Sequence, residues 1–142
     1  MINAAALQLI KEFEGLRLTA YQCPAGKWTI GYGHTGPEVH AGIKITESEA
    51  SAHLIKDVEA AESYVRRVIS VALNPNQFGA LVSLAFNVGV FGQGLRLALN
   101  GKNFDKAVQI WLTYTLVNGV LSDGLKRRRA KEVALFQSPV RP

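Results

Sequence analysis

The chain has 142 residues, of which 48% are hydrophobic and 19% are charged. This balance excludes a disordered chain and predicts one packed domain over residues 1–142. Sixteen Lys and Arg against eleven Asp and Glu leave a net charge of +5. Such a charge favours an anionic partner: a nucleic acid, a membrane surface or an acidic wall polymer. The single cysteine excludes an internal disulfide and a cysteine zinc cluster.

The N-terminal segment MINAAALQLIKEF lacks the basic region and the apolar core of a signal peptide. The longest apolar run is far shorter than a transmembrane helix requires. We therefore expect a small soluble protein that is made in a cytoplasm and has no stable membrane anchor.

The first predicted helix begins after the N-cap Asn3 and ends at about Phe13. Between residues 15 and 42, glycines and prolines recur so often that turns and short strands are predicted. A lobe with a small sheet is accordingly expected over residues 15–45.

The rest of the chain has helical periodicity. A capping box at Thr46-Glu47-Ser48-Glu49 begins a long amphipathic helix that is expected to continue to Val68. Asn74-Pro75 begins the next helix, and further helices are expected at about 95–99, 103–111 and 123–136. The predicted fold class is α+β, with a small sheet near the N-terminus and a larger helical lobe formed by residues 46–142 and the helix 3–13.

Glu14 follows Ile10 by four residues and so lies at the edge of the apolar face of the first helix. Partial desolvation there would raise the pKa of the carboxyl toward the range of a general acid. The alternative is a solvated charge at a helix end, and the spacing alone favours this alternative.

Cys23-Pro24-Ala25-Gly26 has the pattern of a type I turn. In the strand that follows, bulky Trp28, Ile30 and Tyr32 alternate with Thr29, Gly31 and Gly33. This alternation predicts an open face on which a ligand approaches the backbone and Thr29 is the functional group. A hairpin whose glycines merely relieve crowding is the alternative.

The segment FEGLRLTAYQCPAGKWTIGYGHT places eight residues between Glu14 and Cys23 and five between Cys23 and Thr29. It closely resembles the phage-type lysozymes, or endolysins, of glycoside hydrolase family 24. In that family the three positions are usually Glu, Asp and Thr, and Cys at the second position is a known variant. The resemblance covers nearly the whole chain, through Asn76-Gln77-Phe78, the segment 80–89, Trp111 and the segment 124–132.

The resemblance implies a lysozyme-like fold with an active-site cleft between the lobes. It also implies a muramidase that hydrolyses the β-1,4 bond between N-acetylmuramic acid and N-acetylglucosamine in peptidoglycan. Glu14 would be the general acid, Thr29 would hold the attacking water, and no cofactor would be needed. A neutral Cys23 thiol replaces Asp poorly, whereas a thiolate could orient water, stabilise charge or attack the sugar. Cys23 could instead be a small filler in an inactive descendant, or a point of redox control.

The resemblance also implies supporting residues. Arg129, or a neighbour in 127–129, matches an arginine near the catalytic glutamate of the family. Asn87, like Asn118, matches a position near the sugar groove, with ordinary turn chemistry as the alternative. For His34 we expect a hydrogen bond that stabilises its turn, with a role in the groove as the lesser option.

As partners and location, the family implies peptidoglycan, a monomer, and release from the host cytoplasm to the wall or periplasm when a holin opens the membrane. A catalytically silent wall-binding module is the second hypothesis, and a basic nucleic-acid binder is the third. The run 126–131 contains five basic residues, and one such run is usually a solvated face. Here it is interpreted as an edge that faces the wall plus one arginine of the catalytic site, and no nucleic-acid partner is expected. The histidines lack the spacing of metal ligands, and no helix follows the G-x-G-x-x-G pattern at 31–36.

Overall fold

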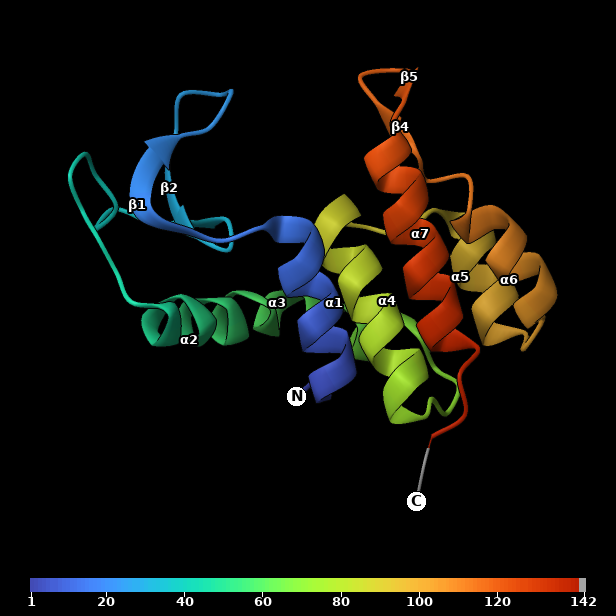
Figure 1. Cartoon of the computed structure of the whole chain (residues 1–142). Coiled ribbons are helices and arrows are strands. Elements are labelled where there is room, and N and C mark those ends of the chain that lie inside the picture. The colour runs from blue at the N-terminus through green and yellow to red at the C-terminus, as the bar shows by residue number, and fades with distance from the viewer. Residues whose placement is uncertain (141–142) are drawn as a thin grey trace. The chain divides into compact units, whose positions relative to one another are not determined.

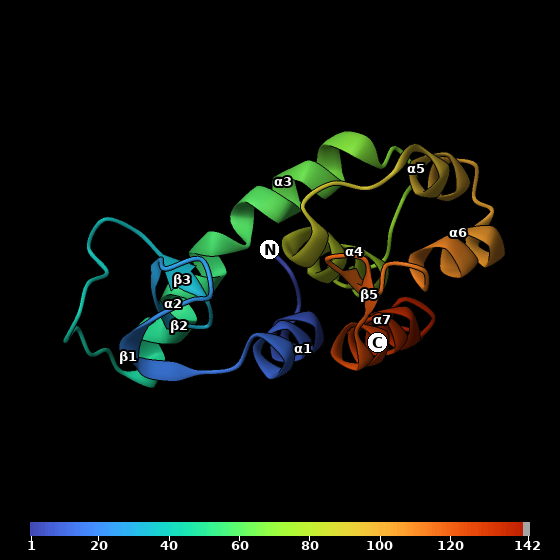
Figure 2. The ribbon, with the colours of Figure 1, turned by 90° about the horizontal axis from the view of Figure 1, so that it is seen from above.

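The computed structural model describes residues 1–140 (Figure 1; Figure 2). In chain order the elements are α1 (Ala4–Glu14), β1 (Arg17–Gln22), β2 (Trp28–Gly31), β3 (His34–Thr35), α2 (Glu47–Asp57), α3 (Glu59–Val68), α4 (Pro75–Val88), α5 (Gln93–Asn100), α6 (Phe104–Trp111), β4 (Leu116–Val117), β5 (Val120–Leu121) and α7 (Asp123–Phe136). This order confirms the α+β fold class. In residues 1–140, no helix combines the length and the apolar character that crossing a membrane requires.

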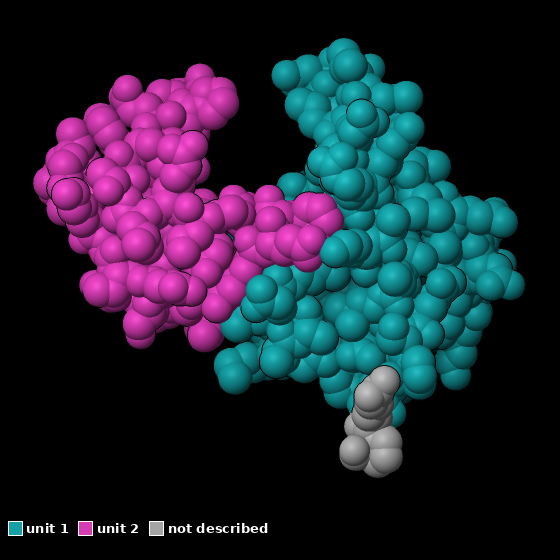
Figure 3. Space-filling view, viewed as in Figure 1, with its two compact units in different colours: residues 1–9, 60–142 teal, residues 10–59 magenta. Residues whose placement is uncertain are grey.

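The chain divides into two compact units (Figure 3). Unit 2 consists of residues 10–59, and unit 1 consists of residues 1–9 together with the described residues from 60 onward.

Unit 2 contains an antiparallel sheet in the order β1-β2-β3, with α2 packed against β2 and β3. Thr29 pairs with Tyr21 on one side and with Thr35 on the other. A turn spans Cys23 to Gly26, where one was predicted, and the Gly26 N–H donates to the Cys23 carbonyl at 2.7 Å. The capping box at the start of α2 is also present.

The long helix expected from residue 46 to Val68 was wrong as a single element. Two helices, α2 and α3, meet at Val58, which keeps right-handed helical backbone angles and is 1% exposed. The interruption is too short to shift the apolar stripe, and for this reason the spacing of apolar residues did not reveal it.

In unit 1, α4 lies beside α7 and α5 lies beside α6 (Figure 1). The start of α1 approaches α4 at Gly79, where a Cβ would overlap that of Ala6. The largest fully buried side chain of the chain is Trp111, on α6. Buried leucines of α4 and α5 complete the apolar core (Leu81, Leu84, Leu95, Leu99).

A buried polar cluster joins α4, α6 and α7. The Glu132 carboxylate is fully buried and accepts hydrogen bonds from Ser83 Oγ at 2.6 Å and from Trp111 Nε1 at 3.0 Å. Arg128 donates from Nε to the same carboxylate at 3.3 Å. Arg128 and Arg129 are 3% and 0% exposed. The run 126–131 therefore does not form one exposed basic edge, because the charges of these two arginines are buried and paired with Glu132 one turn later.

Candidate functional site

Glu14 is the last residue of α1 and is half-buried. Its carboxyl lies over the turn between β2 and β3, because a Cβ on Gly33 would be 3.3 Å from Glu14 Oε1. Gly33 also has a φ of +83°, which favours glycine. Glycine at this position thus permits a close approach between the carboxyl and the backbone.

Cys23 stands at the start of the turn between β1 and β2 and is half-buried. The backbone N–H groups of Lys27 and Ala25 donate to its sulfur and hold the pKa of the thiol below its ordinary value. Burial opposes this effect, and a smaller contribution from the Thr29 side chain lowers the pKa further. The turn therefore favours the thiolate form.

Thr29 lies in the centre of the sheet and is 4% exposed. Its hydroxyl donates to the Lys27 carbonyl at 3.1 Å. While that hydrogen bond is made, the lone pairs of the Thr29 oxygen can accept a hydrogen bond from another group.

The open strand face predicted along Thr29 and Gly31 was wrong, because Thr29 is only 4% exposed and Gly31 is buried as well. Gly31 is buried, and a Cβ there would lie 3.3 Å from the Ala50 Cβ and 3.4 Å from Ile45 Cδ1. Gly31 therefore allows β2 to pack closely against α2. The strand ends at Gly31, and Gly33 belongs to the turn that follows.

The side chain of His34 makes two hydrogen bonds, which connect β3 to α2 and to the loop that follows. Nδ1 contacts Asp57 Oδ2 and Nε2 contacts Glu38 Oε1, each at 2.7 Å. The ring also stacks on that of His53, with centroids 4.1 Å apart. Burial lowers the pKa of His34, but the hydrogen bonds and the negative charges of Glu38 and Asp57 together raise it above the ordinary value.

Arg129 and Asn87 belong to unit 1, where they contact each other. Arg129 Nη2 donates to Asn87 Oδ1 at 2.8 Å, and Arg129 Nε lies 2.8 Å from Glu132 Oε1. Glu132 was missed as a supporting residue in the sequence. Its spacing of three and four residues from the two arginines was the available signal.

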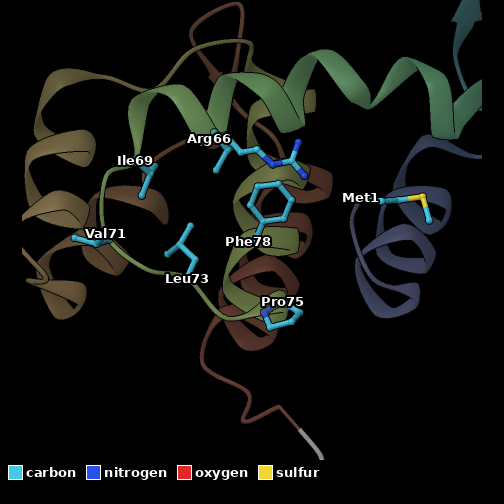
Figure 4. A pocket seen from close by; sticks show the side chains of 8 residues that line it. Met1, Arg66, Ile69, Val71, Leu73, Pro75 and Phe78 are labelled. Carbon is cyan, nitrogen blue, oxygen red and sulfur yellow. The ribbon is translucent and has the colours of Figure 1, made fainter.

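A pocket of about 410 Å³ lies in unit 1 and contains none of the predicted site residues (Figure 4). Its lining is mostly apolar, and the Arg66 guanidinium lies 4.8 Å from the centre of the Phe78 ring. No group of three or more metal-ligating side chains occurs among residues 1–140.

The phage lysozyme family model matches residues 11–132. Two curated relatives are endolysins. The endolysin of Bacillus phage B103 is 41% identical to this chain, and the match covers 95% of this chain and 53% of that endolysin. The endolysin of Salmonella phage P22 is 37% identical, and the match covers 96% of this chain and 98% of that endolysin. The chain spans about half the length of the first curated relatives that it matches.

Among solved structures, the muramidase domain of SpmX from Asticaccaulis excentricus has a TM-score of 0.89 and 38% identity. The match covers 98% of this chain and 99% of that domain. The sequence resemblance and the lysozyme-like fold are thus confirmed, and the chain belongs to the phage lysozyme family.

Proposed function

We propose that the chain is a muramidase that hydrolyses the β-1,4 bond between N-acetylmuramic acid and N-acetylglucosamine in bacterial peptidoglycan. Its role is the lysis of a bacterial host by a phage or prophage, in keeping with the endolysins among its relatives. The proposal rests on one observation. Glu14, Cys23 and Thr29, which have the spacing of the family's catalytic motif, belong to a single compact unit, with the Glu14 carboxyl over Gly33.

In the proposed reaction Glu14 is the general acid. It protonates the leaving glycosidic oxygen while the sugar ring flattens toward an oxocarbenium ion. A water molecule attacks the anomeric carbon from the opposite face, which inverts the configuration. The proton of Glu14 leaves with the departing sugar, so the base that receives the proton of the water must be a second group.

Cys23 is that base, and Thr29 orients the water. Backbone donors stabilise the Cys23 thiolate, which carries the negative charge that an aspartate carries in other family members. The Thr29 proton is directed at the Lys27 carbonyl, so the Thr29 oxygen accepts a hydrogen bond from the water. One acid, one base and one water molecule account for every proton that moves in the reaction, and no cofactor takes part.

Four further residues have supporting roles in the proposal. Gly31 and His34 fix β2 and β3 against α2 and so keep Thr29 and Gly33 in place. Asn87, which is exposed, assists substrate binding from unit 1, and the buried Arg129 positions it by donating a hydrogen bond to its Oδ1. This role of Arg129 and Asn87 rests on the family resemblance.

The family also supports the cellular part of the proposal. The enzyme acts as a monomer, accumulates in the host cytoplasm, and reaches the cell wall or periplasm when a holin opens the membrane.

The test compares clearing of a purified peptidoglycan suspension by the wild type, Glu14→Gln and Glu12→Gln. Glu12 is an exposed carboxylate on the same helix and gives a matched control. Loss of a general acid is expected to slow clearing by about a hundredfold to ten-thousandfold in Glu14→Gln. Glu12→Gln should clear at the wild-type rate, and chromatography should find new reducing ends at N-acetylmuramic acid.

Equal clearing by Glu14→Gln and the wild type would overturn the role of Glu14. If no protein clears the suspension although all sediment with it, the muramidase proposal fails in favour of a wall-binding module.

A further inference from the structure

The β4–β5 hairpin exposes four apolar side chains within six residues. Leu116, Val117, Val120 and Leu121 are 57%, 51%, 68% and 61% exposed. Leu116 pairs with Leu121 and Val117 pairs with Val120, so the two pairs lie on opposite faces of the ribbon. Within residues 1–140 the hairpin forms a sheet of two strands only. Both of its faces are therefore apolar and exposed, which is unusual for a hairpin in water.

The hairpin is tightly closed and firmly held at its base. Asn118 and Gly119 have φ values of +50° and +80°, the pattern of the two-residue type I′ turn. At the base, the Ser122 N–H donates to the Thr115 carbonyl at 2.8 Å, and Thr115 is 6% exposed. Figure 1 shows the ribbon continuing directly into the N-terminal end of α7. The fold thus presents a narrow apolar tip.

Two exposed cations follow the hairpin in the first turns of α7. Lys126 and Arg127 are exposed, and side chains of a helix point toward its N-terminus. Arg127 follows this rule, because its Nη2 lies 3.8 Å from the position of a Cβ on Gly124. Asp123 is the one acidic residue in the first turn. The base of the hairpin is therefore cationic on balance, whereas its tip is apolar.

We propose that the β4–β5 hairpin docks on the surface of an anionic lipid bilayer. The four aliphatic side chains enter the headgroup region, while Lys126 and Arg127 contact the lipid phosphates. A tip of this size gives weak, reversible binding rather than a stable anchor. The proposal goes beyond muramidase activity, because vesicles contain no peptidoglycan and their binding requires no catalysis.

The test is sedimentation of the full chain with vesicles made of equal parts phosphatidylcholine and phosphatidylglycerol, against vesicles of phosphatidylcholine alone. Leu121→Ser is compared with Leu97→Ser, a leucine of α5 that is 65% exposed and stands next to Arg96. We expect binding to anionic vesicles only, weakened about tenfold by Leu121→Ser. Leu97→Ser should bind like the wild type.

A second set of variants removes positive charge at the base of the hairpin. The double variant Lys126→Gln with Arg127→Gln should weaken binding about tenfold, whereas Arg96→Gln should leave it unchanged. Near-ultraviolet circular dichroism of each variant establishes that it is folded. Equal losses in the hairpin variants and their controls would overturn the proposal, as would equal binding to both kinds of vesicle. Self-association that Leu121→Ser abolishes, without vesicle binding, would overturn it in favour of a second copy of the chain.

Discussion

Cys23 owes its acidity to the turn that it begins. The backbone N–H groups of Lys27 and Ala25 donate to the sulfur, and their effect outweighs that of burial, so the pKa of the thiol lies below its ordinary value. The thiolate is the form that reacts with alkylating reagents. We therefore expect the rate of alkylation of Cys23 by iodoacetamide to reach half of its plateau at a lower pH than for a free cysteine, whose pKa is about 8.5.

Mass spectrometry measures this rate without ambiguity, because the chain has one cysteine. Thr29→Val should leave the midpoint below that of a free cysteine, since the backbone donors to the sulfur remain. A wild-type midpoint at or above that of free cysteine would contradict the thiolate base in the proposed reaction.

At the level of single residues, the sequence identified the motif but not the surroundings of each side chain. Glu14, Cys23 and Thr29, which form the motif, all belong to one compact unit. The glycine beside the carboxyl is nevertheless Gly33, and Gly31 serves packing against α2. Alternation along a strand could not separate these two glycines, because the strand ends between them.

His34 connects β3 to α2 through Asp57 and to the following loop through Glu38. Its pKa is raised, so its contribution to the free energy of unfolding is fully present below the unfolded value of about 6.5 and is lost as the pH rises through the folded value. The pKa of Glu38 is lowered, chiefly by the hydrogen bond with His34, so its contribution is lost only in acid. We expect His34→Gln to reduce stability by about 1 kcal/mol at pH 6 and by less at pH 8.

Urea unfolding of the wild type, His34→Gln and His40→Gln at the two pH values measures this difference. His40 is exposed, and its Nδ1 contacts the neighbouring Ala41 carbonyl at 3.0 Å, so its variant is the matched control. His53 stacks on His34 and lowers the pKa of Glu38 through its charge, and it remains in both variants. An equal loss of stability at pH 6 and pH 8 would show that the charge of His34 does not stabilise the fold.

The helices that were predicted correctly are those that a local sequence signal marks. The start of α4 at Pro75 was predicted because Asn74 and Pro75 are signals of a helix start, and the range of α7 was predicted from helical periodicity. The β4–β5 hairpin was not predicted, although Asn118-Gly119 between apolar pairs is the usual signal of a type I′ turn. The burial of Arg128 was not predictable from its own helix, because Ser83, which contacts it, lies 45 residues away.

At the scale of the whole molecule, the net charge of +5 bears on how the proposed enzyme meets its substrate. Bacterial walls carry carboxylates and phosphates, and a cationic protein is attracted to such a surface over about one Debye length, about 8 Å at physiological salt. The chemical step takes place among fixed groups of the site and is screened much less. We therefore expect added salt to raise the apparent KM of wall clearing several-fold while leaving kcat nearly unchanged.

Initial rates of clearing, measured over a range of wall concentrations and of sodium chloride, separate the two parameters. Lys56→Gln combined with Lys106→Gln removes two exposed positive charges, one in each unit, and lowers the net charge from +5 to +3. This variant should have a higher KM at low salt and a weaker dependence on salt, whereas replacement of the same two lysines by arginine should match the wild type. A change confined to kcat would place the effect of salt in the catalytic site. It would also show that the overall charge does not guide the chain to the wall.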